Sequence, residues 1–340
     1  MPKRAPGAIV LAAYSPDPEL FRRQLTSLQA QTVTDWECVI SVDGDVQPVQ
    51  TLISSIIDGD KRFRIVGDGS RLGFYLNFER GIREVSADAA WVALCDQDDQ
   101  WNPDKLERLL PHLDEVSLVS GQARLVSYPS GEILGRTDRS DQGPARTLLS
   151  NQFTGSMLVF STELLQTALP FPRVSTRAAA HDHWLAVVAA AFRGTRIVDE
   201  ILQDYVQHDA NVFGDPSRDS GGSGILASVR NAMAMSRRYE GSASPLALLR
   251  TTFWVYVGWR QILVQTLQAR ASRTSVAATS EDRSFGRRRR WRAMSHTLNA
   301  ALADGYVPAA FATQYRASWL AGAVTAGRRA VDSRAAQSEG

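Results

Sequence analysis

Short apolar runs alternate with helix-like segments along the first 100 residues of the chain. The apolar runs have the length of buried strands and lie at 8–14, 36–45, 62–68 and 90–99. Between them, apolar residues recur at helical spacing over 18–32, 49–57 and 73–85. Because strands that alternate with helices need crossover connections, this order predicts an α/β fold with a mostly parallel central sheet flanked by helices.

The pattern changes in the second half of the chain. Further elements are predicted as strands at 155–160 and 194–199 and as a helix at 181–192. After a stretch rich in Gly and Ser, the chain predicts only helices, at 225–239, 245–270, 287–305 and 310–331. The sequence therefore predicts an α/β domain at 1–214, a linker or loop at 215–224, a basic α-helical C-terminal region at 225–332 and a disordered tail at 333–340.

The composition indicates a globular protein with a substantial core, since 44% of the residues are hydrophobic and 22% are charged. Cys38 and Cys95 each fall in a predicted strand, which suits buried thiols and makes neither a disulfide framework nor a zinc site. The apolar run 8–13 behind Lys3 and Arg4 is too short for a signal peptide and is better interpreted as the first strand. No uninterrupted run reaches the about 18 apolar residues of a spanning helix, so we expect a cytoplasmic protein.

Charge is divided unevenly along the chain. Residues 225–340 carry 17 arginines and 6 acidic residues, a net charge of +11, whereas residues 1–224 carry a net charge of −9. Arginines on the wet faces of ordinary helices explain the basic part without any further function. Alternatively, the basic helices make peripheral contact with anionic lipid at the inner face of the plasma membrane. Nucleic acid is the poorer partner, because no nucleic-acid-reading module accompanies the arginines.

Three carboxylates, Asp96, Asp98 and Asp99, follow directly after the apolar run Trp91 to Cys95. If this segment is extended, Asp96 and Asp98 share one face. Two carboxylates without histidine or thiolate beside them suit a hard cation such as Mg²⁺ or Mn²⁺, bound together with substrate phosphates. The simpler alternative is that Asp99 and its neighbours form a solvated acidic turn, in which Asn102 or Asp104 caps the next helix.

Other polar residues lie where a parallel sheet would bring them near this cluster. Ligands bind outside the carboxyl ends of parallel strands, where Tyr14, Ser15 and Asp43 follow the first two predicted strands. Asp182 opens the helix predicted from residue 181 and is either a helix cap or a general base. His208 follows a strand and is either a surface residue or a group that reaches a metal or phosphate.

Several segments together resemble a known family. VLAAYSPDPELFRRQLTSLQAQTVTDWECVISVDG (10–44) resembles the opening of family 2 glycosyltransferases, which have the GT-A fold. GFYLNFERGI and VALCDQDDQWNPDKL resemble the bacterial rhamnosyltransferase-like branch, and FTGSMLVF, HDHWLAVVAAAF and DYVQHDANVFG follow in the expected order. The resemblance covers about residues 7–214 and implies a GT-A fold there, with a C-terminal α-helical extension after it.

The resemblance also implies an inverting transferase that moves a sugar from a nucleoside-diphosphate sugar to a hydroxyl, with Asp182 as general base. The residues implied to contact the donor are Ala13, Tyr14, Ser15, Asp43, Arg71, Asn77, Asp96, Gln97, Asp98, Gly155 and Ser156. Those implied to hold Mg²⁺ or Mn²⁺ on the diphosphate are Asp96, Asp98, Asp99 and His208. The implied donor is dTDP-rhamnose or a UDP-sugar, and the implied acceptor is a glycan or a lipid-linked cell-surface molecule.

Three departures from the family pattern leave the base and sugar preference open. The family often has paired aspartates after the second strand, where this chain has Val42-Asp43-Gly44-Asp45. It also often has Asn at the positions that Arg71 and Ser15 occupy here. A sugar-phosphate nucleotidyltransferase shares the alternating architecture, but it needs a Gly-rich, basic loop after the first strand, and AAYSPDP is neither. A metal phosphohydrolase needs more His or Asp ligands. A catalytically inactive sugar-binding relative would be expected to lack Asp98 or Asp182, and both are present.

Overall fold

The computed structural model describes residues 6–141, 143–174, 179–208, 225–271 and 291–325. The chain forms two compact units, the first made of 1–143, 151–171 and 181–214 and the second of 144–150, 172–180 and 215–340. The short segments 144–150 and 172–180 therefore belong with the C-terminal region, and not with the domain to which the sequence assigned them. The predicted linker and the predicted tail lie outside the described residues.

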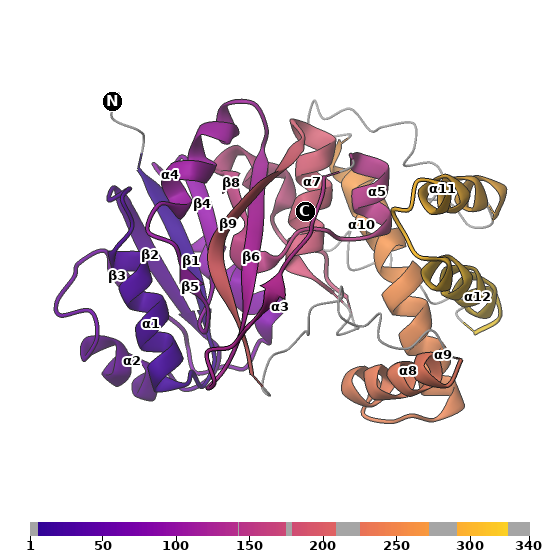
Figure 1. Ribbon diagram of the computed structural model, residues 1–340, viewed down its shortest axis with the longest axis horizontal. Helices are drawn as coiled ribbons and strands as arrows, with labels where there is room; N and C mark the ends of the chain where they lie inside the picture. The colour runs from indigo at the N-terminus through magenta and orange to yellow at the C-terminus, as the bar shows by residue number, and fades with distance from the viewer. Residues whose placement is uncertain (1–5, 142, 175–178, 209–224, 272–290, 326–340) are drawn as a thin grey trace. The chain divides into compact units, whose positions relative to one another are not determined.

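A nine-stranded sheet forms the centre of the first unit in the described part of the chain (Figure 1). Its strands are β1 Gly7–Ala13, β2 Trp36–Val42, β3 Phe63–Val66, β4 Trp91–Asp96, β5 Gln100–Trp101, β6 Leu118–Ser127, β7 Ile133–Arg136, β8 Val159–Ser161 and β9 Thr195–Gln207. The strand order is β3-β2-β1-β4-β8-β6-β9-β5, with β7 paired to β6. Neighbours within β3-β2-β1-β4 are parallel, as are β6 and β9, while β8 runs against β4 and β6. The predicted α/β fold with a mostly parallel sheet is confirmed.

Helices cover both faces of this sheet (Figure 1). The helices of the first unit are α1 Pro18–Gln29, α2 Val46–Ser54, α3 Phe74–Arg83, α4 Lys105–Leu109, α6 Leu165–Ala168 and α7 His181–Phe192, with 3₁₀ turns η1 Leu110–Asp114, η2 Gly155–Met157 and η3 Thr162–Leu164. Ile9 and Leu11 of β1 belong to the core cluster that also contains buried residues of α1, α2 and α4. Val10 faces the other way, where α3 packs so closely that a Cβ on Gly81 would lie 2.5 Å from Val10 Cγ1.

Local sequence explains where the first helix begins. Asp17 is the N-cap of α1, and its Oδ1 accepts hydrogen bonds from the backbone N–H groups of Glu19 (2.9 Å) and Leu20 (3.0 Å). Pro18 occupies the first turn, where the N–H that it lacks would have had no partner in the helix. The same residues place the β1–α1 loop, which begins the candidate site, immediately before a rigid helix.

The second unit is helical in its described part. Its helices are α5 Pro144–Leu149, α8 Ile225–Glu240, α9 Pro245–Phe253, the π segment η4 Trp254–Gly258, α10 Trp259–Ala271, α11 Trp291–Ala303 and α12 Ala309–Thr325. The predicted single helix at 245–270 is thus interrupted by the π segment. There the buried Arg260 guanidinium donates to the carbonyls of Val255 (2.6 Å), Tyr256 (2.9 Å) and Leu149 (2.6 Å), which ties α5 to α10. None of the described helices is both long and apolar enough to cross a membrane.

The sequence missed three strands of the sheet. Strands β5, β6 and β7, all within residues 100–136, were not predicted, whereas the helix expected after the acidic turn is α4, with Asp104 at its N-cap position but without a side-chain cap hydrogen bond. The predicted strand at 194–199 continues to Gln207 as β9, which crosses the whole sheet beside β6. This longer strand matters for the site, because its carboxyl end carries His208 next to the acidic turn.

Candidate active site

The carboxyl ends of three parallel strands meet at one edge of the sheet. In the strand register, Ala13 at the end of β1 is opposite Val42 at the end of β2, and Ala12 is opposite Asp96 at the end of β4. Tyr14, Ser15 and Asp43 follow directly, so the predicted convergence of polar strand ends is confirmed. Ala13 itself is fully buried in the core, with 0% of its surface exposed, and its carbonyl accepts a hydrogen bond from the Asp43 backbone N–H at 2.8 Å, so it lines no open pocket in this structure.

Gln97 links the β1 loop to the acidic turn after β4. Its Oε1 accepts a hydrogen bond from the backbone N–H of Tyr14 at 2.7 Å, and its Nε2 donates to the Tyr14 carbonyl at 3.1 Å. One side chain thus satisfies both polar groups of the Tyr14 backbone. Gln97 therefore fixes the loop on which the base of a nucleotide is expected to rest.

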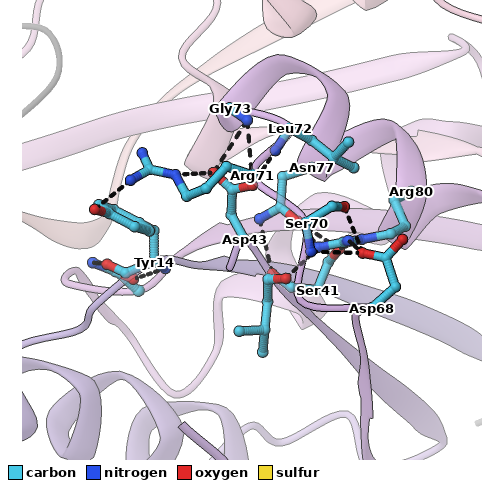
Figure 2. A network of polar contacts seen from close by, with 12 residues as sticks. Tyr14, Ser41, Asp43, Asp68, Ser70, Arg71, Leu72, Gly73, Asn77 and Arg80 are labelled. Carbon is cyan, nitrogen blue, oxygen red and sulfur yellow. Dashed lines mark hydrogen bonds and ion pairs between the residues drawn. The ribbon is translucent and has the colours of Figure 1, made fainter. Parts of the chain in front are cut away.

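Tyr14, Arg71 and Asp43 form a connected group beside that loop (Figure 2). The Arg71 guanidinium lies over the Tyr14 ring, 3.7 Å from its centroid, and Arg71 Nε lies 3.6 Å from Asp43 Oδ2. The buried Asp43 carboxylate also accepts hydrogen bonds from the backbone N–H groups of Leu72 (2.5 Å) and Gly73 (3.1 Å). Asp43 therefore anchors the loop before α3, while Tyr14 and Arg71 remain exposed at the rim.

The loop after β1 is held in an unusual backbone conformation. Ser15 has a φ of 40°, in the left-handed region that Gly and Asn adopt more readily than Ser. The sequence had singled out this residue because Asn is common at the same position in the resembling family. The backbone geometry gives a physical reason for that preference.

Asn77 is not a donor-binding residue in this structure, which corrects the sequence-based prediction. It is 1% exposed, and its amide is used inside the protein: Nδ2 donates to the Ser41 carbonyl at 2.8 Å and Oδ1 accepts from Ser41 Oγ at 2.8 Å. Arg80 also donates to Asn77 Oδ1, at 2.7 Å (Figure 2). The side chain fastens α3 to β2, because its amide oxygen and one amide N–H bond to Ser41 of β2.

The acidic segment is a turn. The prediction that Asp96 and Asp98 share one face assumed an extended strand and is therefore wrong. Strand β4 ends at Asp96, and the following residues reverse direction. Asp98 Oδ2 lies 2.9 Å from Nε2 of His208, which follows β9. The hydrogen bond to Asp98 raises the pKa of His208. Burial, followed by the charges of Asp99, Asp98 and Asp182, raises the pKa of Asp96 well above its usual range, so these carboxylates share one region of the protein.

Asp99 belongs to a buried polar network. It is 1% exposed, and its oxygens accept hydrogen bonds from Gln203 Nε2 (2.8 Å) and from the backbone N–H of Val206 (3.2 Å). Gln203 Nε2 also donates to Ser156 Oγ at 2.9 Å. Lys105 Nζ donates to Gln203 Oε1 at 2.6 Å and to the Ser156 carbonyl at 2.7 Å. Burial raises the pKa of Asp99 and lowers that of Lys105 to about 7.

These placements correct two further predictions. Among the described residues no group of three or more His, Cys, Asp or Glu side chains is arranged to hold a metal, and Asp99 supports the turn from beneath. Ser156 is 0% exposed, and Gly155 is so close to His181 that a Cβ would lie 2.5 Å from His181 Nε2. Gly155 and Ser156 therefore pack behind the site and do not border a sugar directly.

Asp182 is the first-turn carboxylate of α7 and is half-buried. Its Oδ1 accepts a hydrogen bond from the backbone N–H of His183 at 2.6 Å. Burial raises the pKa of Asp182 to about 6, while the His183 N–H, the positive charge of Arg139 and a hydrogen bond from Asn151 act in the opposite direction. Both readings of Asp182 are thus compatible with the structure: it interacts with the helix start, and its pKa lies near the range of a general base.

His181 supports the start of α7 from the buried side. Its ring stacks on Phe78 with 4.1 Å between centroids and meets Phe74 edge-on at 6.0 Å. Burial lowers its pKa to about 3, so the ring is neutral. The ring fills the space that Gly155 leaves open, which fixes the backbone directly before Asp182.

Sequence reasoning missed four residues of the site: Lys105, Gln203, Arg139 and Asn151. Lys105 had one available signal, because it is one of only three lysines in the chain and follows the acidic turn in VALCDQDDQWNPDKL. Arg139, Asn151 and Gln203 had none, since they act across more than 30 residues of sequence, and β6 and the full length of β9 were not predicted.

Comparison with known proteins agrees with this geometry. Residues 8–166 match the model of the family described as Glycosyl transferase family 2. Succinoglycan biosynthesis protein ExoW of Rhizobium meliloti (strain 1021) is 29% identical over 98 residues, which are 29% of this chain and 31% of that protein. Uncharacterized glycosyltransferase YwdF of Bacillus subtilis (strain 168) is 26% identical over 123 residues, 36% of this chain and 43% of that protein. The matches span less than half the length of each relative.

Solved structures show a similar fold. The crystal structure of S. aureus TarS 1-349 in complex with UDP-GlcNAc superposes with a TM-score of 0.52 at 13% identity, covering 94% of this chain and 92% of that chain. A second crystal structure, of S. aureus TarS, gives a TM-score of 0.51 at 14% identity, covering 94% of this chain and 54% of that chain. The predicted GT-A fold is confirmed. Residues 8–166, just under half of the chain, are thus similar to the family described as Glycosyl transferase family 2, and one of the two relatives is named as a glycosyltransferase.

Proposed function

We propose that this protein is an inverting glycosyltransferase that moves a sugar from a nucleoside-diphosphate sugar to a hydroxyl group. One observation carries the proposal: the Asp98–His208 pair and the carboxylate Asp182, whose pKa is near 6, lie around Asp96 at the edge where β1, β2 and β4 end. The exposed Tyr14 ring and the Arg71 guanidinium beside it offer a flat, positively charged surface for the base and phosphates of the donor.

The donor set at Asp98 and His208 fits a divalent cation. Asp98 Oδ2 and His208 Nε2 are hydrogen-bonded at 2.9 Å, so one carboxylate and one imidazole lie side by side, contrary to the expectation of carboxylates without histidine. Because carboxylates suit Mg²⁺ and Mn²⁺ whereas imidazole suits transition metals, this pair fits Mn²⁺ better than Mg²⁺. Asp98 and His208 would hold the ion, with Asp96 beside them, and the ion would supply positive charge to the departing diphosphate.

Asp182 would act as the general base toward the acceptor hydroxyl. A base works best when its pKa lies near the operating pH, and burial brings Asp182 close to that condition. In an inverting displacement, the acceptor hydroxyl would give its proton to Asp182 and attack the anomeric carbon from the face opposite to the departing diphosphate. A single displacement of this kind inverts the anomeric configuration.

The donor and acceptor are narrower parts of the proposal. Resemblance to the rhamnosyltransferase-like branch favours dTDP-rhamnose, with UDP-sugars as the second class. The acceptor would be a glycan or a lipid-linked cell-surface molecule. The basic helices of residues 225–340 would bind anionic lipid and so bring the enzyme close to an acceptor in the membrane.

The test measures donor binding and transfer with purified protein. A panel of dTDP-, UDP- and GDP-sugars is offered with Mn²⁺, Mg²⁺ or EDTA to the wild type, Asp98→Ala and Asp182→Asn, with the exposed Asp88→Asn as a matched control. We expect metal-dependent nucleotide binding that is lost in Asp98→Ala and kept in Asp182→Asn, and turnover that is lost in both. ¹H NMR of the product should show the inverted anomer. Absence of binding with every donor and metal would refute the transferase proposal, and a retained anomer would refute its mechanism.

A further inference from the structure

Lys105 is a buried cation at the back of the proposed active site. Its side chain is 0% exposed, and its ammonium lies 3.6 Å from the centroid of the Trp101 ring. Nζ donates to Gln203 Oε1 at 2.6 Å and to the Ser156 carbonyl at 2.7 Å. Burying an ammonium is costly unless nearby groups compensate its charge. The neighbours Cys95, Asp99 and Asp96 raise the pKa of Lys105 against the effect of burial.

Gln203 connects this cation to the acidic turn. Its Oε1 is the acceptor for Lys105, so its amide orientation is fixed, and its Nε2 must point the other way. There it donates to Asp99 Oδ2 at 2.8 Å. The backbone N–H of Val206 donates to the other Asp99 oxygen at 3.2 Å. The Gln203 amide thus links Lys105 to Asp99 by hydrogen bonds. Both oxygens of Asp99 accept hydrogen bonds from residues of β9.

Asp98 takes its position from residues on either side of it. On one side, Gln97 is fastened to the Tyr14 backbone by two hydrogen bonds. On the other, Asp99 is fastened to β9 through Gln203. Between these two anchors, Asp98 meets His208, which follows the same strand β9. A change at Lys105 would therefore reach Asp98 through the second anchor.

We infer that Lys105 is a positioning residue for the metal-diphosphate site: through Gln203 and Asp99 it fixes the turn that carries Asp98 opposite His208. The same ammonium holds the Ser156 carbonyl, in the segment against which His181 packs directly before Asp182. Lys105 thus also joins the donor side of the site to the side of the proposed base. This inference rests on the proposed function, because it assigns Asp98 and His208 to a metal and diphosphate.

The test measures Mn²⁺ affinity in the presence of UDP or dTDP, by the loss of the free Mn²⁺ EPR signal. Lys105→Met removes the charge and keeps the volume, whereas Gln203→Glu keeps the acceptor for Lys105 and replaces the donor to Asp99 by a repelling oxygen. Lys61→Met is the matched control, since Lys61 is exposed. Thermal unfolding of each variant is recorded without ligand, so that a loss of fold is seen separately.

We expect both site variants to bind Mn²⁺ with the nucleotide about 10- to 100-fold more weakly than the wild type, the usual effect of removing a group that orients a metal ligand. The control should bind like the wild type. Affinity within twofold of the wild type in the folded variants would overturn the inference and leave the proposed function intact. If the wild type binds no Mn²⁺ and nucleotide, the proposed function itself fails. If Lys105→Met does not fold, the result for Gln203→Glu decides the test, because the Glu side chain has the same shape as the Gln side chain that it replaces.

Discussion

The dependence of catalysis on pH tests the proposed base directly. Burial raises the pKa of Asp182 to about 6, and a general base must be deprotonated to act. Below this pKa the protonated form accumulates, so kcat/KM, which reports the free enzyme, should fall as the pH is lowered. One pH unit below the pKa about one tenth of the carboxylate is ionised. We therefore expect kcat/KM at pH 5 to be about tenfold below its plateau above pH 7.

A variant of Arg139 separates this explanation from others. The positive charge of Arg139 lowers the pKa of Asp182, so Arg139→Met should raise that pKa and move the acid limb of the profile to higher pH. Each full unit of movement corresponds to about 1.4 kcal/mol of lost interaction with the charged carboxylate. Arg136→Met is the matched control, because Arg136 is exposed and pairs with Asp199.

The assay follows donor consumption at saturating metal between pH 4.5 and about 8.5, with circular dichroism at each pH to show that the protein stays folded. His208 is the other group whose ionisation matters here, since its pKa is raised by Asp98. Only a limb that belongs to Asp182 should move in Arg139→Met. A wild-type profile that stays flat down to pH 5, or a limb that is identical in the variant and the wild type, would refute the role of Asp182 as base.

Three further predictions concern stability and are measured by thermal or urea unfolding. Ser15→Asn should raise the unfolding free energy by about 0.5–1 kcal/mol and Ser15→Val should lower it, because Asn tolerates the left-handed φ of 40° and a β-branched residue does not. Gly81→Ala should lower it by about 1–3 kcal/mol despite the better helix propensity of Ala, since the new Cβ would lie 2.5 Å from Val10 Cγ1; an unchanged value would contradict the close packing of α3. Arg260→Met should lower it by about 3 kcal/mol and speed amide exchange in α10, because three carbonyls including that of Leu149 lose their donor; unaltered exchange would contradict this.

The sequence predicted those parts of the fold that depend on local pattern. The alternation of apolar runs and helical spacing over 8–99 found β1 to β4 and α1 to α3, because each of these elements buries a continuous apolar face. It did not find β6, whose burial depends on pairing with β8 and β9 far along the chain. The strand β9 was cut short at residue 199 because its charged and exposed positions 199–200 hide the continuation.

The residues of the site divide in the same way, into those that the local sequence pattern predicts and those that depend on distant contacts. Tyr14, Asp43 and Asp98 were identified because they follow strands, and strand ends can be located from the sequence. Asn77 was assigned to the donor because a polar residue on a helix near a site gives no sign of whether its amide is already used. In the folded protein this amide bonds to Ser41 and Arg80. The direction in which a polar side chain points is a tertiary property that no local pattern contains.

Charge balance connects these observations to the chemistry. The described site places Asp96, Asp98 and Asp182 within mutual electrostatic range, and the neighbouring carboxylates raise the pKa of Asp96 further than burial alone. Two nearby basic groups already have partners: Lys105 bonds to Gln203 and the Ser156 carbonyl, and His208 bonds to Asp98. A divalent cation bound at Asp98 would relieve the repulsion among the carboxylates. The binding of this cation should weaken as the pH falls, because the carboxylates then take up protons. Repulsion among the carboxylates of the acidic turn therefore lowers the stability of the free protein, and a metal bound with the diphosphate would offset this repulsion.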